Sequence, residues 1–163
     1  MSLESVRAHL AARAPDVEII VKEVSTATVA QAAEAHGVEP GRIAKTLSLR
    51  VGGRTVLVVA RGDARLDNRK VKAAFGGKAS MLGPEEVAAL TGHPVGGVCP
   101  FGLATPLPVY CDVSLKAFDE VVPAAGSVTS ALRIDPLRMA EIVDATWVDV
   151  CQDPPSPPPS PAP

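Results

Sequence analysis

The stretch from Thr91 to Gly102, with the sequence TGHPVGGVCPFG, constrains this chain most, because it holds four glycines and two prolines in twelve residues. Glycine permits positive φ angles and lets another molecule approach main-chain N–H groups, whereas proline fixes its own φ angle. The unit from Gly96 to Pro100 can therefore hold backbone donors in set directions. Donors of this kind stabilise an oxyanion, and loss of one typically costs roughly 3 kcal/mol of transition-state stabilisation. A structural turn between a helix and a strand is the simpler alternative.

Length and composition indicate one folded domain followed by a tail. The 163 residues are 47% hydrophobic but only 3% aromatic, which predicts an aliphatic core. We expect residues 1–152 to form this domain. Residues 153–163 are mainly proline and serine without apolar periodicity, and we expect a disordered, extended tail there. Such a tail could dock an SH3-like domain or be a passive terminus.

Several classes of protein do not fit this sequence. No apolar run approaches the roughly 18 residues of a membrane span, and the N-terminus, with acidic Glu4, differs from a signal peptide. We therefore expect a cytoplasmic protein that does not bind membranes. Cys99, Cys111 and Cys151 are odd in number, lack a Cys-x-x-Cys pattern and gain no ligand set from the three histidines. Neither a disulfide framework, a metal site nor a cofactor is expected.

Apolar spacing and capping residues predict the secondary structure. The residues Gly52 and Gly53 predict the turn of an antiparallel hairpin. Helices are expected at 3–14, after 25–28 as far as 36–37, after 66–68, at 84–90 and at 136–143, and strands at 17–24, 43–51, 56–60, 107–111, 121–124, 131–134 and 147–150. Strands and helices neither alternate nor segregate. This order favours a single α+β domain with a curved, largely antiparallel or mixed sheet surrounded by short helices.

Charge is unevenly distributed along the chain. The formal net charge is −2, but basic side chains crowd the segment 61–78, where only Asp63 and Asp67 oppose them. A local basic patch suits a partner that offers a few phosphates, because binding strength scales with the phosphates neutralised. A solvated helix face is the alternative. The basic residues taken as candidates for this contact are Arg61, Arg65, Arg69, Lys70 and Lys72.

Lys45 is a second unusual residue, because it lies where the chain enters the apolar strand 43–51. A lysine at such a place is often a solvated edge charge whose aliphatic stem covers apolar surface. If the glycine-rich loop faced it across a cleft, its ammonium could instead hold an anionic or carbonyl group of a substrate.

Several motifs occur together in a fixed order along the chain. They are Gly-Arg-Ile-Ala-Lys-Thr-Leu at 41–47, Gly62-Asp63, Leu66-Asp67, Val-Gly-Gly-Val-Cys-Pro-Phe-Gly at 95–102, Leu107-Pro108 with Asp112, and Ala125-Gly126. This series resembles the YbaK/ProX family, the editing domains associated with prolyl-tRNA synthetase. The resemblance covers residues 25–150.

The resemblance implies a metal-independent hydrolase that removes a wrong amino acid from tRNA, most often tRNA(Pro). It implies an α+β editing domain that stands alone, as a monomer, and could work beside prolyl-tRNA synthetase. Such an enzyme is needed because a synthetase gains only about 1–3 kcal/mol of discrimination per methylene. The mechanism implied has no covalent protein nucleophile, since the terminal ribose hydroxyl of the tRNA assists the reaction.

The same resemblance implies roles for individual residues. Lys45 would hold the aminoacyl-adenosine end, and the backbone of the loop, especially Gly97, would anchor the ester carbonyl and position water. The residues implied to bind the substrate are Thr28, Thr46, Gly96, Val98, Cys99, Pro100, Gly126 and Thr129.

The edited amino acid stays open among alanine, 2-aminobutyrate and cysteine. The loop has Cys99 where many relatives have serine or threonine, which resembles the YbaK-like branch. Relatives that edit Cys-tRNA(Pro) carry an aspartate close to the position of Thr129, which weakens the assignment of cysteine, and alanine or 2-aminobutyrate fits as well.

Two other functions compete with editing. Cys99 could be a nucleophile activated by His93, six residues earlier in the same loop, although no third residue that would orient the imidazole is evident. The chain could also be a catalytically silent tRNA-binding module whose proline-rich tail recruits a partner.

Overall fold

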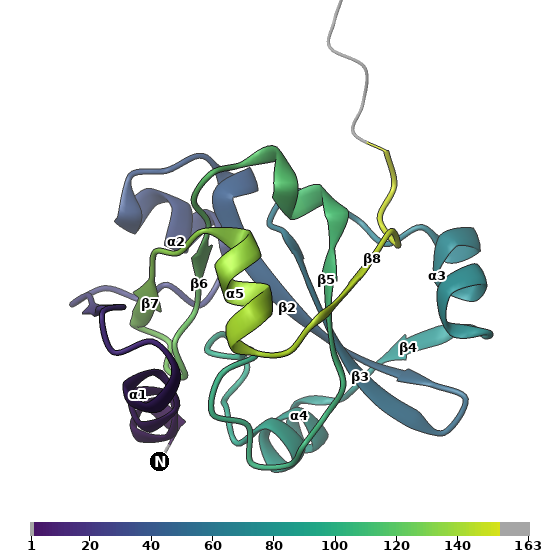
Figure 1. Ribbon diagram of the computed structural model, residues 1–163, viewed down its shortest axis with the longest axis horizontal. Coiled ribbons are helices and arrows are strands. Elements are labelled where there is room, and N and C mark those ends of the chain that lie inside the picture. The colour runs from purple at the N-terminus through teal and green to yellow at the C-terminus, as the bar shows by residue number, and fades with distance from the viewer. Residues whose placement is uncertain (1, 154–163) are drawn as a thin grey trace, which may run out of the picture.

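Two long strands form the centre of the fold. The computed structural model describes residues 2–153, and in it β2 (Ile43–Val51) pairs with β3 (Arg54–Arg61) along their whole length (Figure 1). The ladder is antiparallel and runs from the pair Ala44–Arg61 to the pair Val51–Arg54. The turn between the strands is Gly52-Gly53, and both glycines have positive φ angles of 55° and 82°. The predicted hairpin is therefore confirmed.

Shorter strands extend the hairpin into a six-stranded mixed sheet. On one side of the hairpin, β4 (Ala79–Met81) pairs antiparallel with β2. On the other side, β5 (Val109–Asp112) pairs parallel with β3, and β8 (Thr146–Val148) pairs parallel with β5. The start of β2 also pairs with β6 (Val122–Pro123), and β1 (Ile19–Val21) forms a separate two-stranded sheet with β7 (Ser130–Leu132). The predicted mixed sheet is confirmed, whereas β4 was not predicted and β1 is shorter than expected.

Among residues 2–153, five α-helices and two 3-10 helices surround these strands (Figure 1). Local capping explains where several of them begin and end. Thr28 caps α2 in a capping box with Gln31, Gly37 ends that helix in the left-handed conformation, and Asp67 caps α3. The helices are α1 (Ser2–Arg13), α2 (Val29–His36), η1 (Pro40–Arg42), α3 (Asn68–Phe75), α4 (Pro84–Thr91), η2 (Val113–Ala117) and α5 (Pro136–Ile142).

The two faces of the hairpin pack against different parts of the structure, because successive side chains of a strand point to opposite sides. On one face, Leu49, Val56 and Val58 pack with Val71 and Phe75 of α3. On the other face, Leu57 and Val59 join the largest core cluster, together with Val6 and Leu10 of α1 and Met139 of α5. Thr46 pairs with Val59, and Ser48 pairs with Leu57, so these two hydroxyl side chains point to the second face.

Two further expectations concern the C-terminal tail and membrane-spanning helices. Of the predicted tail 153–163, only Asp153 lies within the described residues. Within residues 2–153, no helix has both the length and the apolar character needed to span a bilayer.

Candidate active site

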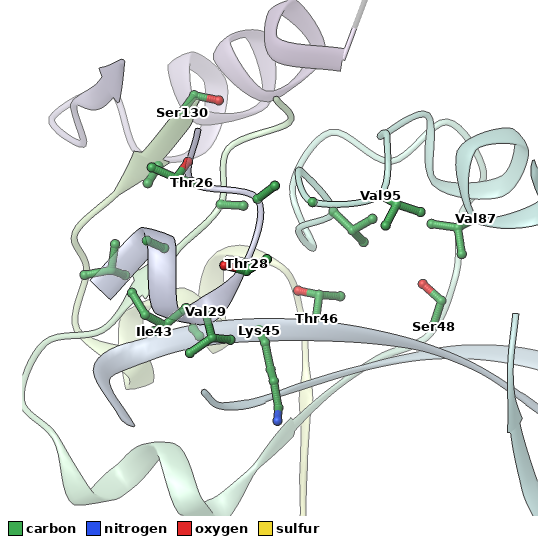
Figure 2. Close-up of a pocket in the computed structure, with 18 of the residues that line it drawn as sticks. Thr26, Thr28, Val29, Ile43, Lys45, Thr46, Ser48, Val87, Val95 and Ser130 are labelled. Atoms are coloured by element: carbon green, nitrogen blue, oxygen red, sulfur yellow. The ribbon is translucent and has the colours of Figure 1, made fainter. Parts of the chain in front are cut away.

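A pocket of about 300 Å³ opens on the second face of the hairpin (Figure 2). The segments that enclose it are the strand β2, the N-terminal end of α2 with the residues before it, the end of β4 with the start of α4, the glycine-rich loop, and the strands β6 and β7. Its walls are mostly aliphatic. The apolar side chains among its lining residues include Val29, Ala32, Ile43, Val87, Val95 and Val122.

Hydroxyl groups supply the polar part of this wall. Thr26 donates to the carbonyl of Val128 at 3.1 Å, and Ser130 donates to the carbonyl of Ala125 at 3.1 Å. Thr46 differs, because its Oγ1 atom is buried and has no hydrogen-bond partner among the described residues. A buried hydroxyl without a partner costs roughly 1–3 kcal/mol. Since Thr46 lines the pocket, a bound molecule is the natural partner for this hydroxyl.

The glycine-rich loop contributes backbone rather than side chains. Gly96 has a φ angle of 91°, and a Cβ atom there would lie 2.7 Å from the Cβ of Ala27. Both Gly96 and Val98 line the pocket, and no hydrogen bond involves their N–H groups within residues 2–153. These two amides are therefore candidate donors to a ligand in the pocket.

Gly97 does not have the predicted position. Its N–H group donates to the carbonyl of Pro94 at 2.9 Å, and its carbonyl accepts from Gly126 at 3.1 Å. A Cβ atom on Gly97 would lie 2.8 Å from the backbone of Ser127. Gly97 is thus a contact between two loops, and its amide is not available to anchor an ester carbonyl. Gly126, also predicted to touch substrate, is the other half of this contact.

Lys45 does not face the glycine-rich loop. Its side chain points away from the pocket in Figure 2, and its ammonium donates to the carbonyls of Gly62, at 3.2 Å, and Ala64. The reason is strand alternation, because Lys45 and Thr46 are neighbours and must point to opposite sides of β2. Lys45 still contributes to the lining of the pocket, but only the Thr46 side chain points into it. Burial lowers the pKa of the Lys45 ammonium, opposed by the nearby Cys151 and Asp63.

The remaining predicted substrate contacts divide into two groups. Thr28 lines the pocket, where its Oγ1 accepts from the N–H of Gln31 at 3.1 Å. Cys99 and Pro100 are buried and do not line it. Thr129 does not line it either, and the adjacent Ser130 does so instead.

Cys99 and His93 are both fully buried in the core. The Cys99 sulfur lies 3.6 Å from Nε2 of His93 and 3.7 Å from the carbonyl oxygen of Phe101. Burial raises the pKa of the Cys99 thiol to about 12. A thiol that remains protonated and has no access to solvent does not suit a nucleophile, so the structure disfavours the thiol-hydrolase hypothesis.

The basic residues of 61–78 are not gathered at the pocket. Arg61 pairs with Asp63 at 2.6 Å, and Lys70 pairs with Asp149 at 3.0 Å and with Asp153 at 2.9 Å. The side chains of Arg65, Arg69 and Lys72 are exposed. Arg69, Lys70 and Lys72 belong to α3, which packs on the face of the hairpin opposite to Thr46.

Several pocket residues were missed by the sequence reasoning. Ser48 could have been found, because it follows Ala44 and Thr46 at the period of two that places residues on one face of a strand. Val87 of α4 and Thr26 carry no such signal, since tertiary packing alone brings them to the pocket. Within residues 2–153, no three histidine, cysteine or acidic side chains gather as a metal-binding group.

The chain belongs to the family of aminoacyl-tRNA editing domains, whose family model matches residues 23–142. It is 50% identical, over 94% of its length and 99% of the relative's, to the uncharacterised protein YwhH of Bacillus subtilis strain 168. It is 30% identical, over 72% of its length and 73% of the relative's, to EbsC of Enterococcus faecalis, whose name proposes Cys-tRNA(Pro)/Cys-tRNA(Cys) deacylase activity. A crystal structure of a protein proposed as a trans-editing enzyme for prolyl-tRNA synthetase superposes with a TM-score of 0.86 and 33% identity, covering 93% of this chain and 98% of that one.

We predict that all three thiols are unreactive in the folded protein. Cys99, Cys111 and Cys151 are buried, and burial raises the pKa of each thiol to about 12. At pH 8 only about one thiol in ten thousand would then be ionised. Labelling with a disulfide reagent at pH 8 should be slow in the native protein and complete for three thiols after unfolding. Labelling of a native thiol within seconds would contradict this prediction.

Proposed function

We propose that this protein is a free-standing trans-editing deacylase that hydrolyses mischarged tRNA(Pro) carrying a small amino acid: alanine, 2-aminobutyrate or cysteine. The observation that carries the proposal is the aliphatic pocket with the Thr46 hydroxyl on one wall and the amides of Gly96 and Val98 on another. The names of EbsC and of the similar crystal structure support mischarged tRNA(Pro) as the substrate. We further propose that the protein works as a monomer in the cytoplasm, alongside prolyl-tRNA synthetase.

The size of the pocket suits a small acyl group. Its volume of about 300 Å³ is at the lower limit of ligand pockets, which span roughly 300–1,000 Å³. Its side chains form an aliphatic box around a few hydroxyls. A second sieve of this kind hydrolyses what fits and spares what does not, which is how editing achieves a discrimination that binding alone cannot supply.

In the proposed mechanism, the amides of Gly96 and Val98 donate to the ester carbonyl of the bound substrate. As the tetrahedral intermediate forms, negative charge develops on that oxygen, and donors held in place by the loop stabilise it without reorganisation. The Thr46 hydroxyl orients the acyl group. The ribose hydroxyl next to the ester assists the attack of water, so the mechanism assigns no protein side chain as general base.

Lys45 is proposed to bind the acceptor end of the tRNA rather than the reacting carbonyl. Its ammonium lies on the far side of β2 from the pocket, where it is partly exposed and bound to two carbonyls. A phosphate of the acceptor end would replace these carbonyls with a charge-assisted contact.

The decisive experiment is single-turnover deacylation of tRNA(Pro) charged separately with alanine, 2-aminobutyrate, cysteine, serine and proline. We expect rapid release of one small amino acid and sparing of proline. Lys45→Ala should lower the rate by about 100-fold or more, as expected for loss of a substrate-binding charge. Cys99→Ala should stay within about tenfold of the wild type, because removal of a nucleophile costs about a millionfold. Absence of release from every charged tRNA(Pro) would instead favour the silent tRNA-binding module.

The variant Thr46→Val should lower the rate of deacylation without lowering the free energy of unfolding. Valine has the same shape and an equal preference for strands, but it removes the hydroxyl that has no partner in the free protein. We expect the free energy of unfolding to stay the same or rise by about 1 kcal/mol, while deacylation falls by about tenfold or more. Thr46→Ser, which keeps the hydroxyl, is the matched control. Unchanged deacylation by the valine variant would remove Thr46 from the proposed site.

The basic residues of α3 are proposed to contact tRNA phosphates outside the pocket. The double variant R69E/K72E should weaken tRNA binding and reduce the salt slope of the dissociation constant by about two. Hydrolysis of a minimal aminoacyl-adenosine should not change, because α3 lies behind the hairpin from the pocket. Arg54→Glu, an exposed charge reversal at the hairpin turn, is the control. Full tRNA affinity in the double variant would exclude α3 as a contact.

A further inference from the structure

His93 is a buried ring that joins two segments of the chain. Its side chain is fully buried, and both ring nitrogens have partners. Nε2 lies 2.7 Å from the carbonyl oxygen of Phe101, so it carries the proton and donates. Nδ1 contacts the hydroxyl of Ser2, the first residue of α1. The ring therefore fastens both ends of the glycine-rich loop to the N-terminal helix.

Ser2 continues this connection to the second loop of the pocket. Its hydroxyl also donates to the carbonyl of Gly126, whose own N–H donates to the carbonyl of Gly97 at 3.1 Å. The single hydroxyl proton of Ser2 thus lies between two acceptors, Nδ1 of His93 and the oxygen of Gly126. The resulting chain of polar contacts, in which the Ser2 proton is shared by two acceptors, runs from Phe101 through His93, Ser2 and Gly126 to Gly97, the residue between the two pocket amides.

Close packing makes the same junction rigid. A Cβ atom on Gly126 would lie 2.8 Å from the carbonyl oxygen of Ser2, and one on Gly102 would lie 2.5 Å from the backbone of Ser5. The N–H of Gly102 also donates to Nδ1 of His9 at 2.8 Å. Both loops therefore rest directly on the backbone of α1, with no side chain between.

We propose that Ser2 and His93 are positioning residues of the site: together they hold the 93–102 loop and the Gly126 turn in the one arrangement that aims the amides of Gly96 and Val98 into the pocket. This inference rests on the proposed function of those amides. It assigns a task to α1, which lies outside the residues 23–142 matched by the family model. It also explains why a histidine is fully buried beside the largest core cluster.

The alternative is that the hydrogen bonds only stabilise the fold. The two possibilities predict different kinetics, because amides that act on the developing oxyanion bind the transition state much more strongly than the neutral carbonyl of the bound substrate. Loss of their alignment should lower kcat with little change in KM. A fold that is merely less stable keeps its kcat at temperatures well below its thermal midpoint.

The experiment compares Ser2→Ala with three other variants of the full chain in deacylation assays on the charged tRNA that the wild type prefers. Ser2→Thr restores a hydroxyl. Ser5→Ala is the matched control, because the Ser5 hydroxyl donates only to the carbonyl of Ser2 within α1. His93→Gln can still donate to Phe101 through its amide but loses the contact with Ser2. Thermal midpoints are recorded for each variant, so that the assays run well below the lowest of them.

We expect Ser2→Ala and His93→Gln to lower kcat by about tenfold or more at nearly constant KM, Ser2→Thr to recover most of the rate, and Ser5→Ala to match the wild type. Proton exchange at the amides of Gly97 and Gly126, which are hydrogen-bonded to the carbonyls of Pro94 and Gly97, should accelerate in the first two variants only. This second readout does not require activity, so it tests the inference even if the wild type deacylates no substrate and the proposed function fails. Unchanged kcat and unchanged exchange in Ser2→Ala, or in His93→Gln if the alanine variant does not fold, would overturn the inference.

Discussion

The antiparallel pairing of β2 with β3 is the interaction on which the rest of the structure depends. Its ladder runs the full length of both strands and decides which side of the sheet each side chain meets. Leu49 and Val56 go to the face covered by α3, while Thr46 and Ser48 go to the pocket. A slip of one residue would exchange these two sets and place leucine and valine side chains where the hydroxyls are needed. Burial of both faces makes such a slip prohibitively unfavourable.

The groups that face into the pocket are uncharged and are held in place by the fold. One lysine contributes to its lining, but the ammonium of Lys45 turns to the other face and is bound there by two carbonyls. What remains inside is an aliphatic box, a few hydroxyls and two loop amides. In the proposed function, such groups bind an ester with little reorganisation, provided that the loop does not move. The direct contact of Gly97 with Ser127, and of both loops with α1, supplies that rigidity.

Features with a local cause could be predicted from the sequence. The capping box of Thr28, the left-handed Gly37 and the Gly52-Gly53 turn each depend on residues a few positions apart. Residues of the glycine-rich loop line the pocket, and the binding role predicted for this loop stays a prediction. The individual roles of its residues could not be predicted, because whether Gly97 or its neighbours offer a free amide depends on hydrogen bonds to Pro94 and Gly126. The choice between Thr129 and Ser130 likewise depended on the register of β7 in the folded chain.

The sequence by itself determined the class of fold, the hairpin, the helix ends and the family, because short-range residue spacing and the order of motifs specify all of these. The tertiary structure alone decided the direction of the Lys45 ammonium, the burial of Cys99 and His93, and the separation of the α3 charges from the pocket. It also brought Ser2 against Gly126, which lies far along the chain. The physical reason is that burial and long-range contact arise only when distant segments pack together, and no local pattern records which of them will meet.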